Sequence, residues 1–311
     1  MKKSILPFSL LLACAFIFPA SFSAGAKEGL TLWFGTVLPN LFPFILITNI
    51  LTYLNGLEYL SKLFALPFKK LFGVRASCCY SIFIGFFCGY PMGAKAIADS
   101  LDQHLITRSE AEYLLAFCNN VSPIYIINYI ILASFKDNGL LKPLLVILLA
   151  APVIYSFIYR LGRRFYFSKP DTEPIHIMSA GNKAQSPSMM DSCIMSTFEL
   201  MWKIGGYIIF FSILGQLISQ LPIRIPVLKL FLIGTMEMTI GIAHICNSAL
   251  PLTTQIVLVC ILSTFGGLST TGQTYSIINA QGLSVKKYSL HKIGTAVIAG
   301  LLAVVYVIFR A

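Results

Sequence analysis

The chain has 311 residues, of which 57% are hydrophobic and only 11% are charged. Soluble domains carry about 25% charged residues, so this composition excludes a soluble globular protein and predicts an all-α polytopic membrane protein. The formal net charge of +11 does not indicate a nucleic-acid partner. Most of the basic residues lie between apolar segments, where they form a collar on one surface of the membrane. Membrane lipid is the expected surrounding.

The first apolar segment, residues 5–25, follows the basic start Lys2-Lys3. A cleaved signal peptide ending near Ala26 is one interpretation of this pattern. The apolar stretch continues to Phe22, however, which is long enough for a membrane helix. We therefore favour an uncleaved N-terminal transmembrane helix within residues 1–29.

After this helix, the same series of predicted elements occurs twice along the chain. Each series contains a span, an amphipathic surface segment with a proline, an interrupted apolar segment, a broken span and a final span. Further full spans are predicted at residues 30–54, 110–134, 142–161, 196–220, 253–281 and 291–309, surface segments at Leu60–Val74 and Leu221–Leu230, and re-entrant hairpins at 76–103 and 230–248. The repeats occupy residues 30–161 and 196–311, and the polar residues 162–195 form a cytoplasmic linker.

The distribution of charge predicts that the two repeats are inverted. We place the N-terminus in the cytoplasm and let both hairpins return to the side from which they enter. Most lysine and arginine residues, Lys292 among them, then fall on the cytoplasmic side. Gly93 matches Gly241 in the order of features, and Ser122 matches Ser269. The expected fold is an inverted repeat with two re-entrant helical hairpins and two broken helices.

Lys95 is the most informative charge in the first hairpin, where it ends the run from Gly89 to Lys95. A lysine in hydrocarbon requires a partner or water. It contacts an anionic solute at the hairpin tip, or it forms an ion pair with Asp99 one helical turn further on. Both interpretations hold if the solute competes with Asp99 for the ammonium group.

Glu237 lies at the corresponding tip of the second hairpin. We favour a function as a ligand for a solute or a cation, or as a protonation site, because ionisable residues at membrane depth are functional by default. A structural hydrogen bond to freed backbone groups is the alternative. His244, two turns further on, is interpreted as a helix-packing residue.

Small and polar residues occur at each of the two predicted helix breaks. Pro123 removes a backbone donor, so freed carbonyls and amide oxygens there can form a sodium site or a socket for polar atoms of a solute. Gly266 and its neighbours, with Gln273, offer a second such arrangement, and close helix packing is the alternative. The predicted binding residues lie at the tips and breaks: Tyr90, Pro91, Gly93, Lys95, Asn119, Asn120, Ser122, Glu237, Gly241, Gly266, Gly267, Ser269 and Thr270.

Four motifs together carry a resemblance to a known family: Leu38 to Phe44, Gly89 to Lys95, Phe117 to Pro123 and Phe265 to Ser269. With them the chain resembles, over most of its length, the YlbJ family of sporulation integral membrane proteins, within the wider group that has a Gate or nucleoside recognition domain. The resemblance implies an architecture related to concentrative nucleoside transporters. It also implies transport of dipicolinic acid across the outer forespore membrane.

The same motifs depart from those of nucleoside transporters. Those proteins have a Gln-Thr-Glu run in the first hairpin, where this chain has Tyr90-Pro91-Met92. They have an Asn-Phe-Ser-Ser run in the late broken helix, where this chain has Gly267 to Thr270. A shared scaffold with a different, anionic substrate is the interpretation that the resemblance favours.

Three functions follow as hypotheses. The first is a secondary transporter of a small anionic solute in the cell membrane. The second is a cation-coupled nucleoside or nucleobase transporter, and the third is a non-transporting scaffold of a sporulation complex. No phosphate-binding loop, metal motif or Ser/His/Asp arrangement is visible in the sequence, so neither an enzyme nor a cofactor is expected. Na⁺ and H⁺ both stay open as coupling ions, and so does a homo-oligomer.

Overall fold

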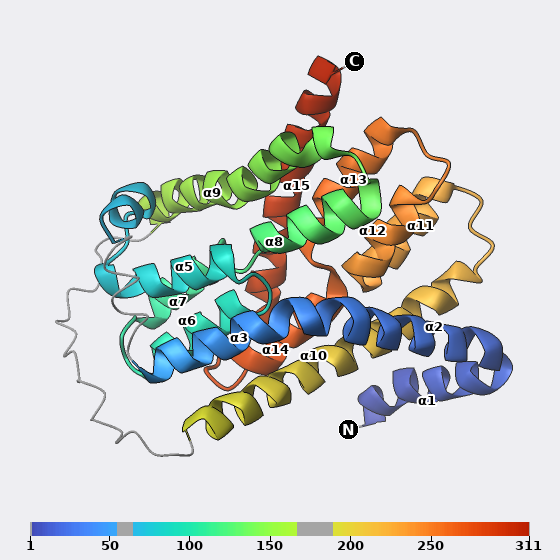
Figure 1. The fold of residues 1–311 in the computed structure, drawn as a ribbon, viewed down its shortest axis with the longest axis horizontal. Helices are drawn as coiled ribbons and strands as arrows, with labels where there is room; N and C mark the ends of the chain where they lie inside the picture. Colours follow the sequence, from blue (N-terminus) through green and yellow to red (C-terminus); the bar gives the residue numbers. More distant parts are fainter. Residues whose placement is uncertain (1, 55–64, 167–188, 311) are drawn as a thin grey trace.

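The computed structural model describes residues 2–54, 65–166 and 189–310, and the regular elements within these ranges are all helices (Figure 1). The chain between Tyr166 and Met189 lies outside the described residues, and with it most of the predicted linker 162–195. The prediction of an all-helical protein is confirmed for the part of the chain that the structure describes.

The N-terminal helices divide at a different place from the one predicted. Helix α1 covers Lys2–Ile17, and α2 begins at Pro19, whose fixed φ suits the first position of a helix. From there α2 (Pro19–Leu32), the π-helical η1 (Trp33–Val37) and α3 (Leu38–Tyr53) follow without interruption. The predicted separation between spans 5–25 and 30–54 is therefore wrong, because Pro19 is the residue that starts a new helix.

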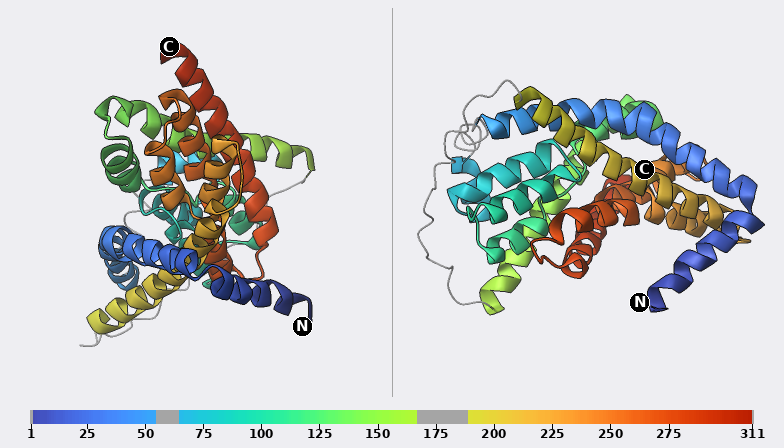
Figure 2. Two further views of the ribbon diagram at one scale, coloured as in Figure 1. Left: turned by 90° about the vertical axis from the view of Figure 1, so that its right-hand side faces the viewer. Right: turned by 90° about the horizontal axis from the view of Figure 1, so that it is seen from below.

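Helix α10 (Met189–Ser219) runs beside this long helix (Figure 2). The indole nitrogen of Trp33 donates a hydrogen bond to the carbonyl of Met201 at 3.0 Å. Near the other end, the amide of Asn49 donates to the hydroxyl of Thr197 at 3.0 Å. These two contacts fix the first helix of the cavity wall against the second half of the chain.

The first predicted hairpin is a packed helix pair. Helix α5 (Cys79–Phe87), preceded by the 3₁₀ turn η2 (Ala76–Cys78), packs against α6 (Met92–Asp102). The two backbones approach closely at Gly85 and Gly93. A Cβ at either glycine would overlap the carbonyl oxygen of Cys118. Only residues without a side chain fit where the two helices meet the following segment.

Residues before this hairpin form a helix at Ala65–Phe72 that meets the segment Ala76–Phe87 at 103°. This helix falls within the predicted surface segment Leu60–Val74, whose first residues lie outside the described ones.

The predicted broken span 110–134 is interrupted where the sequence predicts it, between Phe117 and Pro123. Helix α7 covers only Arg108–Leu115, and the chain then loses helical structure until α8 (Pro123–Tyr125) and the π-helical η3 (Ile126–Phe135). Thr107 and Glu110 form a capping box at the start of α7. Asn119, Asn120 and Pro123 mark this break in the sequence, between apolar residues on both sides.

The turn η4 (Asn138–Leu140) leads into α9 (Leu141–Tyr166), which confirms the predicted span 142–161.

The second hairpin consists of α11 (Pro226–Met236) and α12 (Met238–Cys246), joined at Glu237. The predicted surface segment Leu221–Leu230 is helical only from Pro226 onward, in the first turns of α11, and residues 221–225 are not helical. A Cβ at Gly241 would overlap the backbone of Gly234. The two helices of this pair therefore approach through glycines, as they do in the first hairpin.

The remaining helices are α13 (Leu252–Phe265), α14 (Gly267–Ile278) and α15 (Val285–Arg310). Between α13 and α14 the backbone passes through Gly266 and Gly267 with φ angles of 86° and 76°, which a residue with a Cβ adopts only under strain. Helix α15 crosses the molecule and packs against α13 and α9 (Figure 1).

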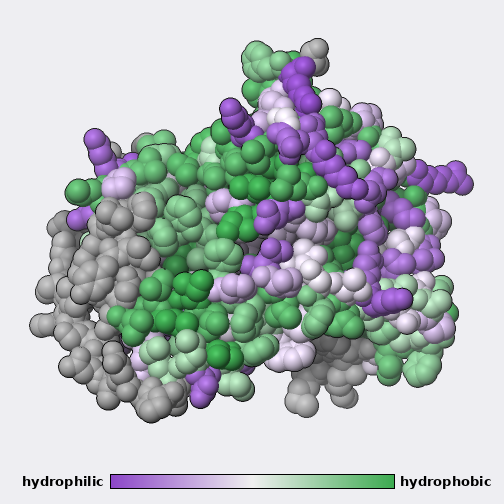
Figure 3. All heavy atoms as spheres, viewed as in Figure 1, coloured by the Kyte–Doolittle hydropathy of each residue, from purple (hydrophilic) through white to green (hydrophobic). Residues whose placement is uncertain are grey.

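Five helical segments of the described chain are long and apolar enough to cross a membrane, or six if the bent pair at residues 65–87 counts as one span. The sequence predicts seven. The difference lies in α1, which has only 16 residues, and in the broken segment 108–135. Large hydrophobic side chains such as Leu301 and Ile308 are exposed on these helices, and hydrophobic residues cover much of the face shown in Figure 3. This surface fits a lipid environment.

Candidate functional site

The tip of the first hairpin, Cys88 to Pro91, places Tyr90 in the interior. The side chain is buried, and its hydroxyl donates a hydrogen bond to the carbonyl of Thr264 at 2.8 Å. Thr264 lies at the end of α13, directly before the glycine break. The first hairpin is thus joined to the broken helix of the second half.

The tip of the second hairpin is joined to the first half in the same way. The hydroxyl of Tyr125 lies 2.9 Å from the hydroxyl of Thr239, and the hydroxyl of Tyr129 donates to the Thr239 carbonyl at 2.8 Å. Both tyrosines follow the break in the first half. The two hairpin tips and the two breaks therefore converge, each tip on the break of the other half.

Glu237 forms the turn between α11 and α12 and is only 4% exposed. Its carboxylate accepts a hydrogen bond from the backbone N–H of Ile240 at 2.8 Å, which caps the start of α12. Glu237 therefore forms the structural hydrogen bond to a freed backbone group that the sequence analysis gives as the alternative to a ligand function. The same side chain also lines a cavity, so the cap does not remove it from the site.

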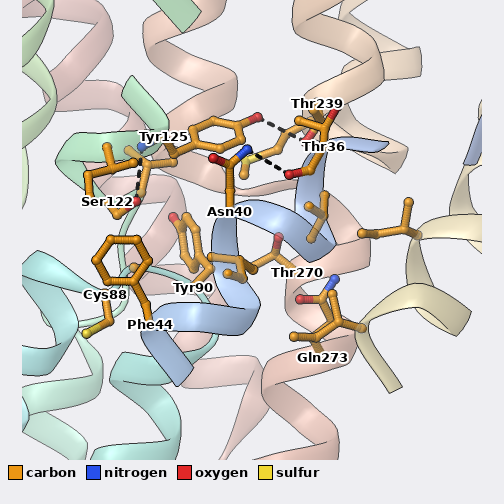
Figure 4. Close-up of a pocket in the computed structure, with 18 of the residues that line it drawn as sticks. Thr36, Asn40, Phe44, Cys88, Tyr90, Ser122, Tyr125, Thr239, Thr270 and Gln273 are labelled. Atoms are coloured by element: carbon orange, nitrogen blue, oxygen red, sulfur yellow. Dashed lines mark hydrogen bonds between the residues drawn. The ribbon is translucent and has the colours of Figure 1, made fainter. Parts of the chain in front are cut away.

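This cavity has a volume of about 70 Å³ and lies where the tips and breaks meet (Figure 4). The long N-terminal helix closes one side of it with Thr36, Asn40 and Phe44, and the amide of Asn40 donates to the carbonyl of Thr36 at 2.7 Å. Polar side chains supply much of the remaining wall: Tyr90, Ser122, Tyr125, Glu237, Thr239, Thr270 and Gln273.

A second, apolar cleft of about 290 Å³ adjoins the cavity. Phe44, Phe87, Cys88 and Ile124 line both spaces. These four side chains are therefore the partition between the cavity and the apolar cleft.

Four of the residues predicted from the sequence line the cavity: Tyr90, Ser122, Glu237 and Thr270. Ser122 uses its hydroxyl to cap α8, accepting from the N–H of Tyr125 at 3.1 Å. The other predicted residues do not line the cavity: Pro91, Gly93, Lys95, Asn119, Asn120, Gly241, Gly266, Gly267 and Ser269.

Asn119 and Asn120 belong to a buried polar network behind the cavity wall. The amide of Asn119 donates to the hydroxyls of Thr274 at 3.0 Å and Tyr288 at 2.9 Å, and its oxygen accepts from the N–H of Ala94 at 3.3 Å. The amide of Asn120 donates to the carbonyl of Phe117 at 2.5 Å. These asparagines hold the break in place, and a solute in the cavity does not reach them in this conformation.

Lys292 was not predicted as part of the site. The charge pattern assigns it to the cytoplasmic collar, but α15 places it 1% exposed in the interior, with its ammonium group 3.0 Å from the carbonyl oxygen of Asn119. The assignment to the collar is therefore wrong. The only signal in the sequence is that Lys292 opens the apolar run of its helix, whereas Lys286 and Lys287 precede that run.

Lys95 forms the ion pair with Asp99 that the sequence offers as one of two interpretations. The ammonium nitrogen and a carboxylate oxygen are 2.6 Å apart, and the two side chains are 31% and 35% exposed. Lys95 does not line the cavity. A contact between Lys95 and an anionic solute stays a prediction.

This ion pair leads to a test with three variants. Lys95→Met leaves the Asp99 carboxylate without its partner, and we expect a modest loss of transport and stability. Lys95→Met combined with Asp99→Asn removes both charges, so uptake should return to the wild-type rate. Uptake by proteoliposomes at matched protein content measures this. If the double variant remains as impaired as Lys95→Met, Lys95 contacts the solute itself.

Further cavity residues follow from the structure alone. Thr36 and Tyr125 line the cavity, and the sequence marks neither of them as a ligand. His244 was interpreted as a packing residue, but its ring nitrogen lies 3.1 Å from the carboxylate of Glu28. Tyr125 and His244 acquire these partners only when distant segments meet, and no local spacing predicts that.

The helices and the cavity define an integral membrane protein with a polar site inside an apolar helical bundle. Comparison with known proteins agrees with the resemblance predicted from the motifs. Residues 34–136 match the Gate family, described as nucleoside recognition. The chain is 24% identical to the sporulation integral membrane protein YlbJ of Bacillus subtilis (strain 168), over 96% of this chain and 82% of that protein. No solved structure matches the chain.

Proposed function

We propose that this protein is a secondary membrane transporter of a small anionic solute, with dipicolinic acid as the first candidate. One observation carries the proposal of transport. A cavity with polar side chains in its wall lies inside an apolar bundle, and both hairpin tips, the first helix break and the helix after the second break contribute to that wall. Broken helices that meet at one site are typical of secondary transporters.

We further propose that the two helix pairs are re-entrant hairpins and that the halves of the chain form an inverted repeat. Two parallels support this. Each pair closes through glycines, Gly85 with Gly93 and Gly234 with Gly241. Each tip also bonds to the broken helix of the opposite half. The orientation with a cytoplasmic N-terminus rests on the distribution of lysine and arginine.

Transport requires the walls of the cavity to separate. A volume of about 70 Å³ is smaller than the roughly 150 Å³ that accommodates one benzene ring. An aromatic ring with two carboxylates therefore enters only after a movement. Phe44 and Phe87 separate the cavity from the adjoining cleft, and this partition is the part of the wall that we propose to move.

The choice of an anionic solute rests on the positive charge of Lys292 and on the similarity to YlbJ. The ammonium group of Lys292 lies 4.9 Å from the ring centre of Tyr90, which itself lines the cavity, so a positive charge stands directly behind the wall. YlbJ carries a name that connects it with sporulation. The family resemblance implies dipicolinic acid as the solute and the outer forespore membrane as the location, and we propose both for this chain.

A nucleoside or nucleobase is a second candidate, and one observation favours it. Within the described chain, the only lining residue with a formal charge at neutral pH is the acid Glu237. A carboxylate and the nearby amide of Gln273 suit hydroxyl and N–H groups better than they suit a dianion. The family description, nucleoside recognition, points the same way.

Uptake into proteoliposomes distinguishes these functions. We expect purified protein to take up labelled dipicolinate, to take up less uridine, and to be inhibited by excess unlabelled dipicolinate. Liposomes without protein are the control for leakage. Uridine uptake without dipicolinate uptake would select the second candidate. Uptake of neither solute by protein that unfolds cooperatively on heating would leave the scaffold of a sporulation complex and contradict transport.

A further inference from the structure

The helix break in the first half of the chain, at Asn119 and Asn120, binds the ammonium group of Lys292. The ammonium nitrogen of Lys292 donates to the backbone carbonyl of Asn119 at 3.0 Å and to the side-chain oxygen of Asn120 at 3.2 Å. It also lies over the aromatic face of Tyr90, 4.9 Å from the ring centre. The side chain is 1% exposed.

The partners of this ammonium group are neutral. Among the residues that the structure describes, no carboxylate forms an ion pair with Lys292. A backbone carbonyl, an amide oxygen and an aromatic face are groups that bind small cations without neutralising them. The arrangement therefore has the ligands of a monovalent cation site, and Lys292 fills it.

The groups that bind the ammonium nitrogen, which we call the socket, are held in place by further hydrogen bonds. Asn119 is held by Ala94, Thr274 and Tyr288, so its carbonyl oxygen has a fixed direction. Tyr90 is held by its bond to the carbonyl of Thr264. The cation thus connects the first break, the first hairpin and α15 at one point.

We propose that the ammonium group of Lys292 takes the place of a coupling sodium ion at the first helix break, so that the protein binds no sodium there. The inference rests on the proposed transport function, because only a transporter requires a coupling ion. It deepens that function by assigning the ion. A tethered ammonium group cannot cross the membrane with the solute, so transport does not depend on a sodium gradient.

The test uses thermal unfolding of the purified full-length protein, followed by the fluorescence of Trp33 and Trp202. An ion that binds the folded state raises Tm. We expect the same Tm for the wild type in sodium chloride and in choline chloride at equal ionic strength. A rise of Tm that is specific to sodium in the wild type would overturn the proposal.

Lys292→Ala empties the socket and leaves its oxygens in place. We expect a lower Tm than that of the wild type in choline chloride, and a rise in Tm when sodium replaces choline. Lys286→Ala, on the exposed side of the same helix, is the matched control and should show neither effect. Lys292→Ser, which adds a hydroxyl oxygen to the socket, should show the same rise. Folded Lys292 variants that have the same Tm in sodium chloride and in choline chloride would contradict a cation site.

The outcome is separable from the proposed function. We expect wild-type uptake of dipicolinate to be equal with sodium and with choline outside the vesicles. If no solute is taken up but the Tm pattern is as expected, the transport proposal fails, and Lys292 still occupies a cation site that excludes sodium. If uptake occurs and requires sodium, the assignment of Lys292 fails and transport holds.

Discussion

Replacement of Gly85 by valine should abolish the native fold. A Cβ at this position overlaps the carbonyl oxygen of Cys118, and Gly93 approaches the same oxygen from the other helix of the pair. Overpacking of a core costs about 1–3 kcal/mol when side chains can adjust. Here the obstacle is the backbone at the first break, which a rotamer change cannot relieve, so the loss should exceed that range. The measure is the yield of monodisperse protein in size-exclusion chromatography.

Gly206→Val provides the matched control for this substitution. Gly206 lies on the exposed side of α10, and a Cβ there meets no atom within 4 Å. Its yield and Tm should equal those of the wild type. A Gly85→Val protein with the wild-type Tm would show that the first hairpin does not pack against the break as described.

Glu237→Gln should reduce uptake about tenfold to a hundredfold while the protein stays folded. The glutamine retains an oxygen that can accept from the N–H of Ile240, the bond at 2.8 Å that caps α12. It lacks the charge and the exchangeable proton of the carboxyl group. A hydrogen bond to a charged group contributes about 1.5–3 kcal/mol, and this range corresponds to the expected loss. Initial uptake rates and Tm together test the expectation.

Two further variants define what Glu237 does. Glu237→Ala removes the cap as well, which should lower stability by about 1 kcal/mol in addition to the loss of uptake. Glu199→Gln, at an exposed glutamate paired with Lys203 on α10, should change neither quantity. Wild-type uptake by Glu237→Gln would reduce the role of Glu237 to capping the helix.

The helix pairs were predictable because glycine and proline interrupt apolar segments at Gly89 to Pro91 and because Glu237 divides another. The break in segment 110–134 was predictable in the same way, because Asn119, Asn120 and Pro123 interrupt apolar sequence. Pro123 also indicated where the helix starts again. The π-helical geometry of Ile126–Phe135 has no such signal in the sequence.

Residues of the site were predictable only where they interrupt an apolar segment of the sequence. Tyr90, Ser122, Glu237 and Thr270 were found in this way and line the cavity. Lys292 was missed because lysines at the ends of spans are normally exposed on the cytoplasmic side. Its partners Asn119 and Asn120 lie in the other half of the chain, and no pattern in a single sequence pairs them.

The bond between Lys292 and Asn119 joins residues 173 positions apart, and this separation has a consequence for biosynthesis. At about 5–20 residues per second, the ribosome adds Lys292 roughly ten to thirty seconds after Asn119. During that time the first half of the chain has entered the membrane with the oxygens of its break unsatisfied. Synthesis of α15 is therefore the step that completes the buried network, and a nascent chain that stalls before this helix lacks the ammonium group that binds these oxygens.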